Sequence, residues 1–184
     1  MSRTTVKRTL VRKATLAAIL ALVGVTAEGS FTSVAAAPVA NQRFSGFIVA
    51  SSATGSREVV AGGISGRGVF NGRGHVVEVQ NLPDDPDNVS RDDLVFRTGT
   101  IHIVSTTQDA TFSQDPATCI VTGTLTQTTT TDGGTGRFAH VTGSFAATVS
   151  VRASAQRNRD GSCSQDQGPL LELDVLTAEG TLAL

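Results

Sequence analysis

The fold is decided by the stretch TTTTDGGTGRFAHVTG, residues 128–143. A phosphate-binding loop as rich in glycine as this one would need a Lys-Ser or Lys-Thr pair and a following helix. Here Arg137 and Phe138 come next, and strand-like sequence lies on both sides. Glycines between two strands supply the positive φ angles of a tight turn or bulge. The stretch therefore predicts a structural turn that packs over Phe138 and Phe145, with its glycines at Gly133, Gly134, Gly136 and, in the next strand, Gly143.

The sequence before this turn alternates with a period of two. Threonines at 122, 124, 126, 128 and 130 share one strand face, and Cys119, Val121, Gly123 and Leu125 share the other. One solvated face and one packed face are typical of antiparallel sheets. Val, Ile, Thr and Phe are dense elsewhere, and no stretch keeps a helical repeat. We expect strands at 43–50, 57–65, 66–70, 74–80, 94–105, 119–131, 140–155 and 171–184.

These strands predict an all-β fold. Polar, turn-rich segments join them at 81–93, 106–118 and 156–169. About eight antiparallel strands in one domain favour a closed, eight-stranded antiparallel β-barrel, because closure removes the exposed edges that invite aggregation. A two-sheet β-sandwich is the alternative. No repeat of 20–50 residues indicates a propeller or a solenoid.

The N-terminus predicts a secretory signal peptide over residues 1–36. Five basic residues precede an apolar run from Ala14 to Val25, and small residues follow at 33–37. Twelve apolar residues are too few to cross a bilayer, which takes about 20. No cysteine follows the run for a lipid anchor. We therefore expect cleavage near Ala36 and Ala37, export, no membrane association afterwards, and one domain over residues 37–184.

Composition excludes nucleic acid as a partner. The expected signal peptide removes five of 15 basic and one of 16 acidic residues, which leaves 10 basic and 15 acidic residues. A surface with this excess of negative charge repels phosphate backbones. Trp and Tyr are absent, so only Phe is present to stack on bases.

The two cysteines, Cys119 and Cys163, are most simply a disulfide in an exported protein. A catalytic thiol and a metal-binding pair are the alternatives. A reactive thiolate needs a nearby base or a helix start, and the sequence indicates neither.

The glycine turn also resembles a known family. Gly123-Thr124-Leu125 followed by Gly133 to Gly143 is similar to the C-terminal half of dirigent proteins and of the allene oxide cyclase barrel-like families, and GGISGRG resembles their early Gly-rich strand. The resemblance implies an eight-stranded barrel, often trimeric, with an apolar cavity for a small organic molecule. It also implies an isomerase or cyclase activity that needs no cofactor: closure of an allene oxide, coupling of phenoxy radicals or cyclisation of polyketides.

Motifs for other chemistry are weak. The chain has no G-x-S-x-G elbow and no H-E-x-x-H motif. His75, His102 and His140 lie in separate segments without paired metal-ligand spacing. The acidic run at 84–88, with Asp92 and Asp93, lacks the spacing of a calcium loop and is interpreted as a solvated turn. Asn88-Val89-Ser90 matches a glycosylation sequon. We therefore expect no metal and no cofactor.

Candidate ligand-pocket residues come from charges within apolar strands. Arg97 alternates onto the face of Ile101 and Ile103, His102 lies on the opposite face, and Glu78 interrupts GHVVEVQ. An inward charge needs a partner or a ligand; otherwise these are solvated outer residues. The pocket candidates are Arg97, Glu78, His102, Ile101, Ile103, Val121 and Leu125.

Three hypotheses for function follow from this sequence. The first is an exported barrel that binds a small hydrophobic molecule and steers its cyclisation or coupling. The second is a binding or carrier barrel without catalysis. The third is an extracellular structural barrel whose interior is filled by side chains, since eight-stranded barrels can be either packed or hollow.

Overall fold

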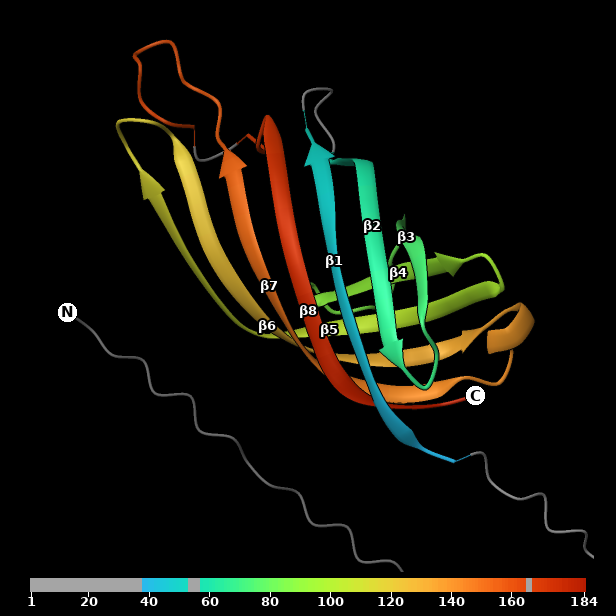
Figure 1. Cartoon of the computed structure of the whole chain (residues 1–184). Helices are drawn as coiled ribbons and strands as arrows, with labels where there is room; N and C mark the ends of the chain where they lie inside the picture. The colour runs from blue at the N-terminus through green and yellow to red at the C-terminus, as the bar shows by residue number, and fades with distance from the viewer. Residues whose placement is uncertain (1–37, 53–56, 165–166) are drawn as a thin grey trace, which may run out of the picture. The chain divides into compact units, whose positions relative to one another are not determined.

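The computed structural model describes residues 38–52, 57–164 and 167–184; the expected signal peptide lies outside these ranges. Within them the chain forms a closed barrel of eight antiparallel strands in sequence order (Figure 1), so the predicted fold class is confirmed. The barrel closes where β1 pairs with β8, from Ala40 opposite Leu182 to Ala50 opposite Glu172. The strands are β1 (Ala40–Ser51), β2 (Glu58–Gly68), β3 (Gly72–Val79), β4 (Val89–Phe96), β5 (Gly99–Asp115), β6 (Ile120–Gly134), β7 (Thr142–Ser154) and β8 (Leu171–Ala183).

Four predicted strand or loop assignments are wrong. The expected strands 57–65 and 66–70 form one strand, β2. The expected strand 94–105 is two strands, because the chain reverses at Arg97-Thr98 and Phe96 pairs with Gly99. Gly99 has a φ of 145°, which a residue with a side chain rarely adopts. The expected loops at 81–93 and 106–118 are partly strand, since β4 begins at Val89 and β5 continues to Asp115.

The glycine turn joins β6 to β7 through a short 3-10 helix, η1 (Gly136–Phe138). Gly133 and Gly136 have φ angles of 82° and 57°. Gly134 is extended backbone packed so closely that a Cβ would lie 2.4 Å from the carbonyl oxygen of Thr100. The turn presses Phe138 into the barrel, where its side chain is fully buried.

Five phenylalanine side chains close this end of the barrel; we call them the aromatic plug. The ring centroid of Phe70 lies 4.9 Å from that of Phe138 and 5.0 Å from that of Phe96. Phe44 lies 5.2 Å from Phe145 in an edge-to-face arrangement, a favoured geometry for aromatic pairs. All five rings are buried.

A buried amide secures the plug to the backbone. The Gln42 side chain is fully buried; its Oε1 accepts the Phe70 N–H at 3.1 Å and its Nε2 donates to the Phe70 carbonyl oxygen at 3.3 Å. A buried amide without such partners would cost stability. These contacts hold the turn between β2 and β3 over the barrel end.

The predicted alternation of β6 is confirmed, as is the disulfide. The threonines at 122, 124, 126, 128 and 130 are exposed, whereas the alternate residues face inward. Cys119 and Cys163 are joined, with their Cα atoms 5.4 Å apart. The bond ties the start of β6 to the loop between β7 and β8. Among the described residues, no helix has the length and hydropathy needed to cross a membrane.

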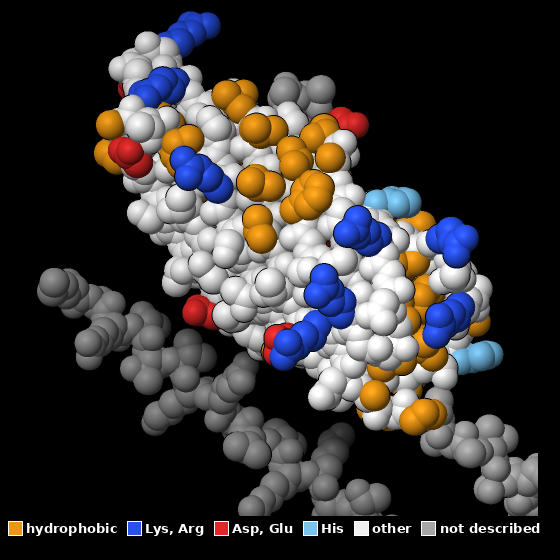
Figure 2. All heavy atoms as spheres, in the orientation of Figure 1, with side chains coloured by type: hydrophobic (Ala, Val, Ile, Leu, Met, Phe, Trp, Pro, Cys, Tyr) orange, Lys and Arg blue, Asp and Glu red, His pale blue; other side chains and the backbone are white. Residues whose placement is uncertain are grey.

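Apolar side chains also gather on the outer surface, over β1, β2 and β8 (Figure 2). Phe47, Val60, Leu171 and Val175 each expose about half of their surface. On these strands, therefore, apolar side chains are found on the outer face of the barrel as well as on its inner face.

Candidate functional site

The barrel interior holds a cavity of about 370 Å³. The plug residues Phe44 and Phe145 close one end of it, and aliphatic side chains from most of the strands form its walls. Two polar groups of the wall pair with each other: the hydroxyls of Ser105 and Thr129 lie 2.9 Å apart. Ligand pockets usually measure about 300–1,000 Å³ and are mostly apolar, so this cavity lies at the small end of that range. Its aliphatic wall includes Ile48, Ile64, Ile101, Ile103, Leu125 and Leu176.

A charged cluster lies at the other end of the cavity, where β2, β4 and β8 begin and β3 ends. Arg57, just before β2, donates from Nε to Glu172 Oε1 at 3.0 Å and from Nη1 to Glu78 Oε1 at 2.9 Å. Its Nη2 donates to Asp174 Oδ2 at 3.2 Å. Asp92 pairs with Glu78 across β3 and β4 and lines the same cavity. We call these five residues the acidic cluster.

Two carboxyl groups of the acidic cluster hold their protons unusually well. Burial, together with the nearby charge of Glu78, raises the pKa of Asp92 to about 6. Burial likewise raises the pKa of Asp174 to about 7, assisted by the charge of Glu172 and by a hydrogen bond with that side chain. Removal from water disfavours the charged form of a carboxyl group. The cluster therefore exchanges protons near neutral pH.

The second oxygen of Asp174 has no protein partner. Asp174 keeps only 8% of its surface exposed, and its Oδ1 is buried without a hydrogen bond among the described residues. A buried carboxylate oxygen in this state is costly. Asp174 itself lines the cavity, so a ligand there lies beside an acceptor that the described residues leave unsatisfied.

The barrel wall opens beside the acidic cluster. Strands β2 and β3 pair only from Ile64 opposite Gly74 to Gly66 opposite Gly72. Past that short ladder a solvent-open groove lies between them, and Arg57 and Glu78 line both this groove and the central cavity. Their side chains remain 34% and 45% exposed. The groove gives a small molecule a route into the barrel.

The predicted pocket residues separate into three groups: those that line the cavity, one that faces inward away from it, and two that lie outside the barrel interior. Glu78, Ile101, Ile103 and Leu125 line the cavity. Val121 lies on the inward face of β6, nearer the disulfide and away from the cavity wall.

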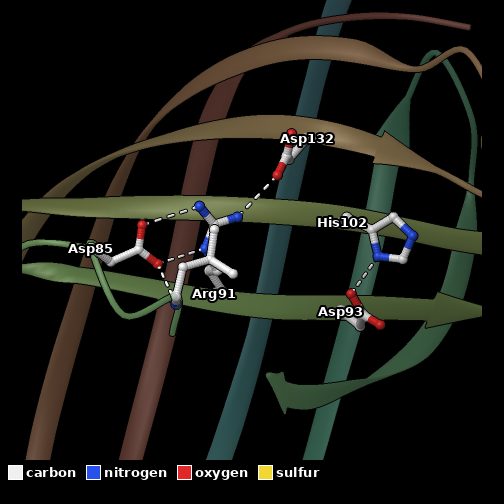
Figure 3. Close-up of polar contacts among 6 residues, drawn as sticks. Asp85, Arg91, Asp93, His102 and Asp132 are labelled. Carbon is white, nitrogen blue, oxygen red and sulfur yellow. Dashed lines mark hydrogen bonds and ion pairs between the residues drawn. The ribbon is translucent and has the colours of Figure 1, made fainter. Parts of the chain in front are cut away.

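Two predicted pocket residues are misplaced. Arg97 is exposed in the hairpin turn between β4 and β5, so it does not share the inward face of Ile101. His102 lies on the outer face, where its Nδ1 is 2.5 Å from Asp93 Oδ1 (Figure 3). Alternation along one continuous strand had aligned Arg97 with Ile101, and the chain reversal removes that alignment.

Asp85, in the acidic run before β4, also forms an ion pair on the outer surface. Arg91 Nε donates to Asp85 Oδ2 at 2.7 Å, and Arg91 Nη1 donates to Asp132 Oδ2 at 3.0 Å (Figure 3). The guanidinium hydrogen bond lowers the pKa of Asp85. In the described part of the chain, no group of three His, Cys, Asp or Glu side chains is arranged to hold a metal ion.

Four members of the acidic cluster were not predicted: Arg57, Asp92, Glu172 and Asp174. In LELDVL, from Leu171 to Leu176, the alternation itself is clear. Its usual interpretation places the apolar residues inside. The structure has the reverse, with Leu171 and Leu173 exposed and the acidic residues facing the cavity. Acidic residues at alternate positions of an otherwise apolar strand are the only sequence signal for this site.

Comparisons of the chain with protein-family models, curated proteins and solved structures find no match. The similarity of the glycine turn to dirigent and allene oxide cyclase barrels therefore remains a hypothesis about relatedness.

Proposed function

We propose that this protein is an exported barrel that binds one small, mostly apolar organic molecule in its interior, with a polar end of the molecule at the acidic cluster. The observation that supports this most is the cavity of about 370 Å³, with aliphatic walls and the acidic cluster at one end. An apolar protein cavity of about 150 Å³ accommodates a benzene molecule. The space here suits a molecule of roughly twice that size.

The architecture supports specific binding over simple solvent filling. The plug packs one end with buried aromatic rings, and the charged groups lie at the opposite end beside the groove between β2 and β3. A ligand that enters by this groove buries its apolar part against Ile101 and Ile103. Its polar end remains among the charged side chains.

Native mass spectrometry of the protein purified from its own secretion medium tests this function. We expect a bound molecule at one per chain, released when the barrel is unfolded. Protein stripped of that molecule should bind an environment-sensitive hydrophobic dye at one site. A chain that carries no ligand and shows no saturable dye binding contradicts the proposal.

A second candidate function is supported by the raised pKa values of Asp92 and Asp174. A carboxyl group protonated near neutral pH can act as a general acid. Such a group beside an apolar cavity suits a cofactor-free isomerisation or cyclisation of the bound molecule. Asp92→Asn should then retain the isomer that enters, whereas the native protein should retain the rearranged isomer of equal mass. Chromatography of the molecules released from the two proteins distinguishes the isomers. If both proteins release the same isomer, the barrel carries its ligand without catalysis.

A further inference from the structure

We propose that the molecule held in the cavity carries a positive charge, as an amine with an apolar body, and that Asp174 Oδ1 accepts a hydrogen bond from its ammonium group. This inference rests on the proposed small-molecule binding and adds the chemical class of the ligand. It follows from the charges and hydrogen bonds of the acidic cluster and from a fully buried acceptor, Asp174 Oδ1, that has no hydrogen-bond partner among the described residues.

The cluster has more acidic than basic groups. Glu78, Asp92, Glu172 and Asp174 supply four carboxyl groups from β3, β4 and β8. Among the described residues that line the cavity, Arg57 is the only basic one. With every carboxyl group ionised, the cluster has a negative charge that the protein itself does not balance. Buried charges of this kind require a counter-charge or neutralisation by protons.

The guanidinium group is already occupied. Arg57 donates to Glu172, Glu78 and Asp174 through three different nitrogens, at 3.0, 2.9 and 3.2 Å. An anionic ligand would have to displace one of these carboxylates and would meet the remaining ones. The cluster therefore disfavours an anion even though it contains an arginine.

Asp174 supplies the open position. The residue lines the cavity. Its Oδ2 is held by Arg57, while its Oδ1 is buried and has no hydrogen-bond partner in the described structure. Without a ligand, protonation of Asp174 reduces the charge of the cluster, and burial raises its pKa accordingly. An ammonium group at the same place would supply both a positive charge and hydrogen-bond donors.

The pH dependence follows from the groups around Asp174. Arg57 precedes β2, Glu78 is on β3, Asp92 is on β4, and Glu172 lies two residues away on β8. A cation favours the ionised carboxyl groups, so its affinity should rise as the pH rises through the pKa values of Asp92 and Asp174, about 6 and about 7. Above that range the affinity should level off.

Three probes of matched shape test the charge: phenylbutylamine, phenylbutanol and phenylbutyrate. Binding to the ligand-free protein is measured by calorimetry at about pH 8 and about pH 5, on either side of the two pKa values. We expect the amine to bind at least about tenfold more tightly than the alcohol at the higher pH, as a charged hydrogen bond permits. The preference should shrink to less than about threefold at the lower pH. Phenylbutyrate should bind most weakly.

Two variants test the assignment of the acceptor. Asp174→Asn should remove the preference for the amine, because it should weaken amine binding at least about tenfold and weaken alcohol binding less than that. Glu179→Gln is the matched control, because Glu179 lies on the outer face of β8, where its side chain is 67% exposed and contacts Arg43. It should behave as the native protein does. Should Asp174→Asn fail to fold, Glu78→Gln replaces it, since it lowers the same negative charge at a half-exposed position.

The outcomes separate the two proposals. Equal affinity for the amine and the alcohol at both pH values, or tightest binding of phenylbutyrate, overturns the inference and leaves the binding function standing. A preference for the amine that survives in Asp174→Asn also overturns the assignment to Asp174. If none of the three probes binds, the proposed binding function fails as well.

Discussion

Filling the cavity should abolish ligand binding without unfolding the barrel. Ala147 of β7 is buried and lines the cavity wall next to Phe145. A phenyl ring added there requires about the space that holds one benzene, roughly 150 Å³, out of the 370 Å³ present. Ala147→Phe should therefore leave roughly 220 Å³, too little for a ligand that needs about twice the space of benzene. Overpacking should lower the free energy of unfolding by about 1–3 kcal/mol.

The magnitude of the effect is measurable by thermal unfolding. A ligand at 100 times its dissociation constant stabilises the folded state by about 2.7 kcal/mol. For a domain of this size each kcal/mol raises the melting temperature by about 2–4 °C. Saturating phenylbutanol should thus raise the melting temperature of the native protein by roughly 5–11 °C.

The matched control is Ala146→Phe, because Ala146 is the adjacent residue and faces outward. We expect this variant to keep the full ligand-induced rise, whereas Ala147→Phe should show a rise below about 2 °C. If folded Ala147→Phe retains the full rise, the ligand binds elsewhere and the reasoning is refuted.

The remaining predictions concern stability. The free energy of unfolding should fall as pH rises from about 4 to about 7, because folded Asp92 and Asp174 keep protons that the unfolded chain releases; a profile just as steep in Asp174→Asn contradicts this. Gly134→Val should cost more than about 1 kcal/mol in urea unfolding, since its Cβ would meet backbone at 2.4 Å; unchanged stability refutes the tight packing. The disulfide between Cys119 and Cys163 closes a loop of 44 residues, and reducing it should lower the free energy of unfolding by up to about 4 kcal/mol. An unchanged melting temperature after reduction would show that the bond adds no stability.

The fold could be predicted because its signals are local. The alternating threonines of β6 report a strand with one solvated face, and Gly133 and Gly136 report a reversal that only glycine tolerates without strain. The hairpin at Arg97-Thr98 was missed because it has two residues and apolar sequence on both sides. Two short signals there, Thr98 and Gly99, were interpreted as part of a continuous strand.

The site could not be predicted because it depends on which face of each strand points inward. Inward and outward residues alternate in the same way whichever face is apolar, and β8 has acidic residues inside and leucines outside. Arg57 joins the site only because barrel closure brings the start of β2 near Glu172 and Asp174, more than a hundred residues later. No local pattern contains that contact.

The most direct test of the central claim is to locate a bound molecule by NMR. Nuclear Overhauser effects are measured between the ring protons of phenylbutanol and the methyl groups of a methyl-labelled protein. If the ligand lies inside the barrel, its ring contacts the methyl groups of Ile101, Ile103 and Leu176, which line the cavity. Contacts confined to the exposed Val60 and Leu173 on the outer surface would contradict the claim that this protein binds its ligand in the barrel interior.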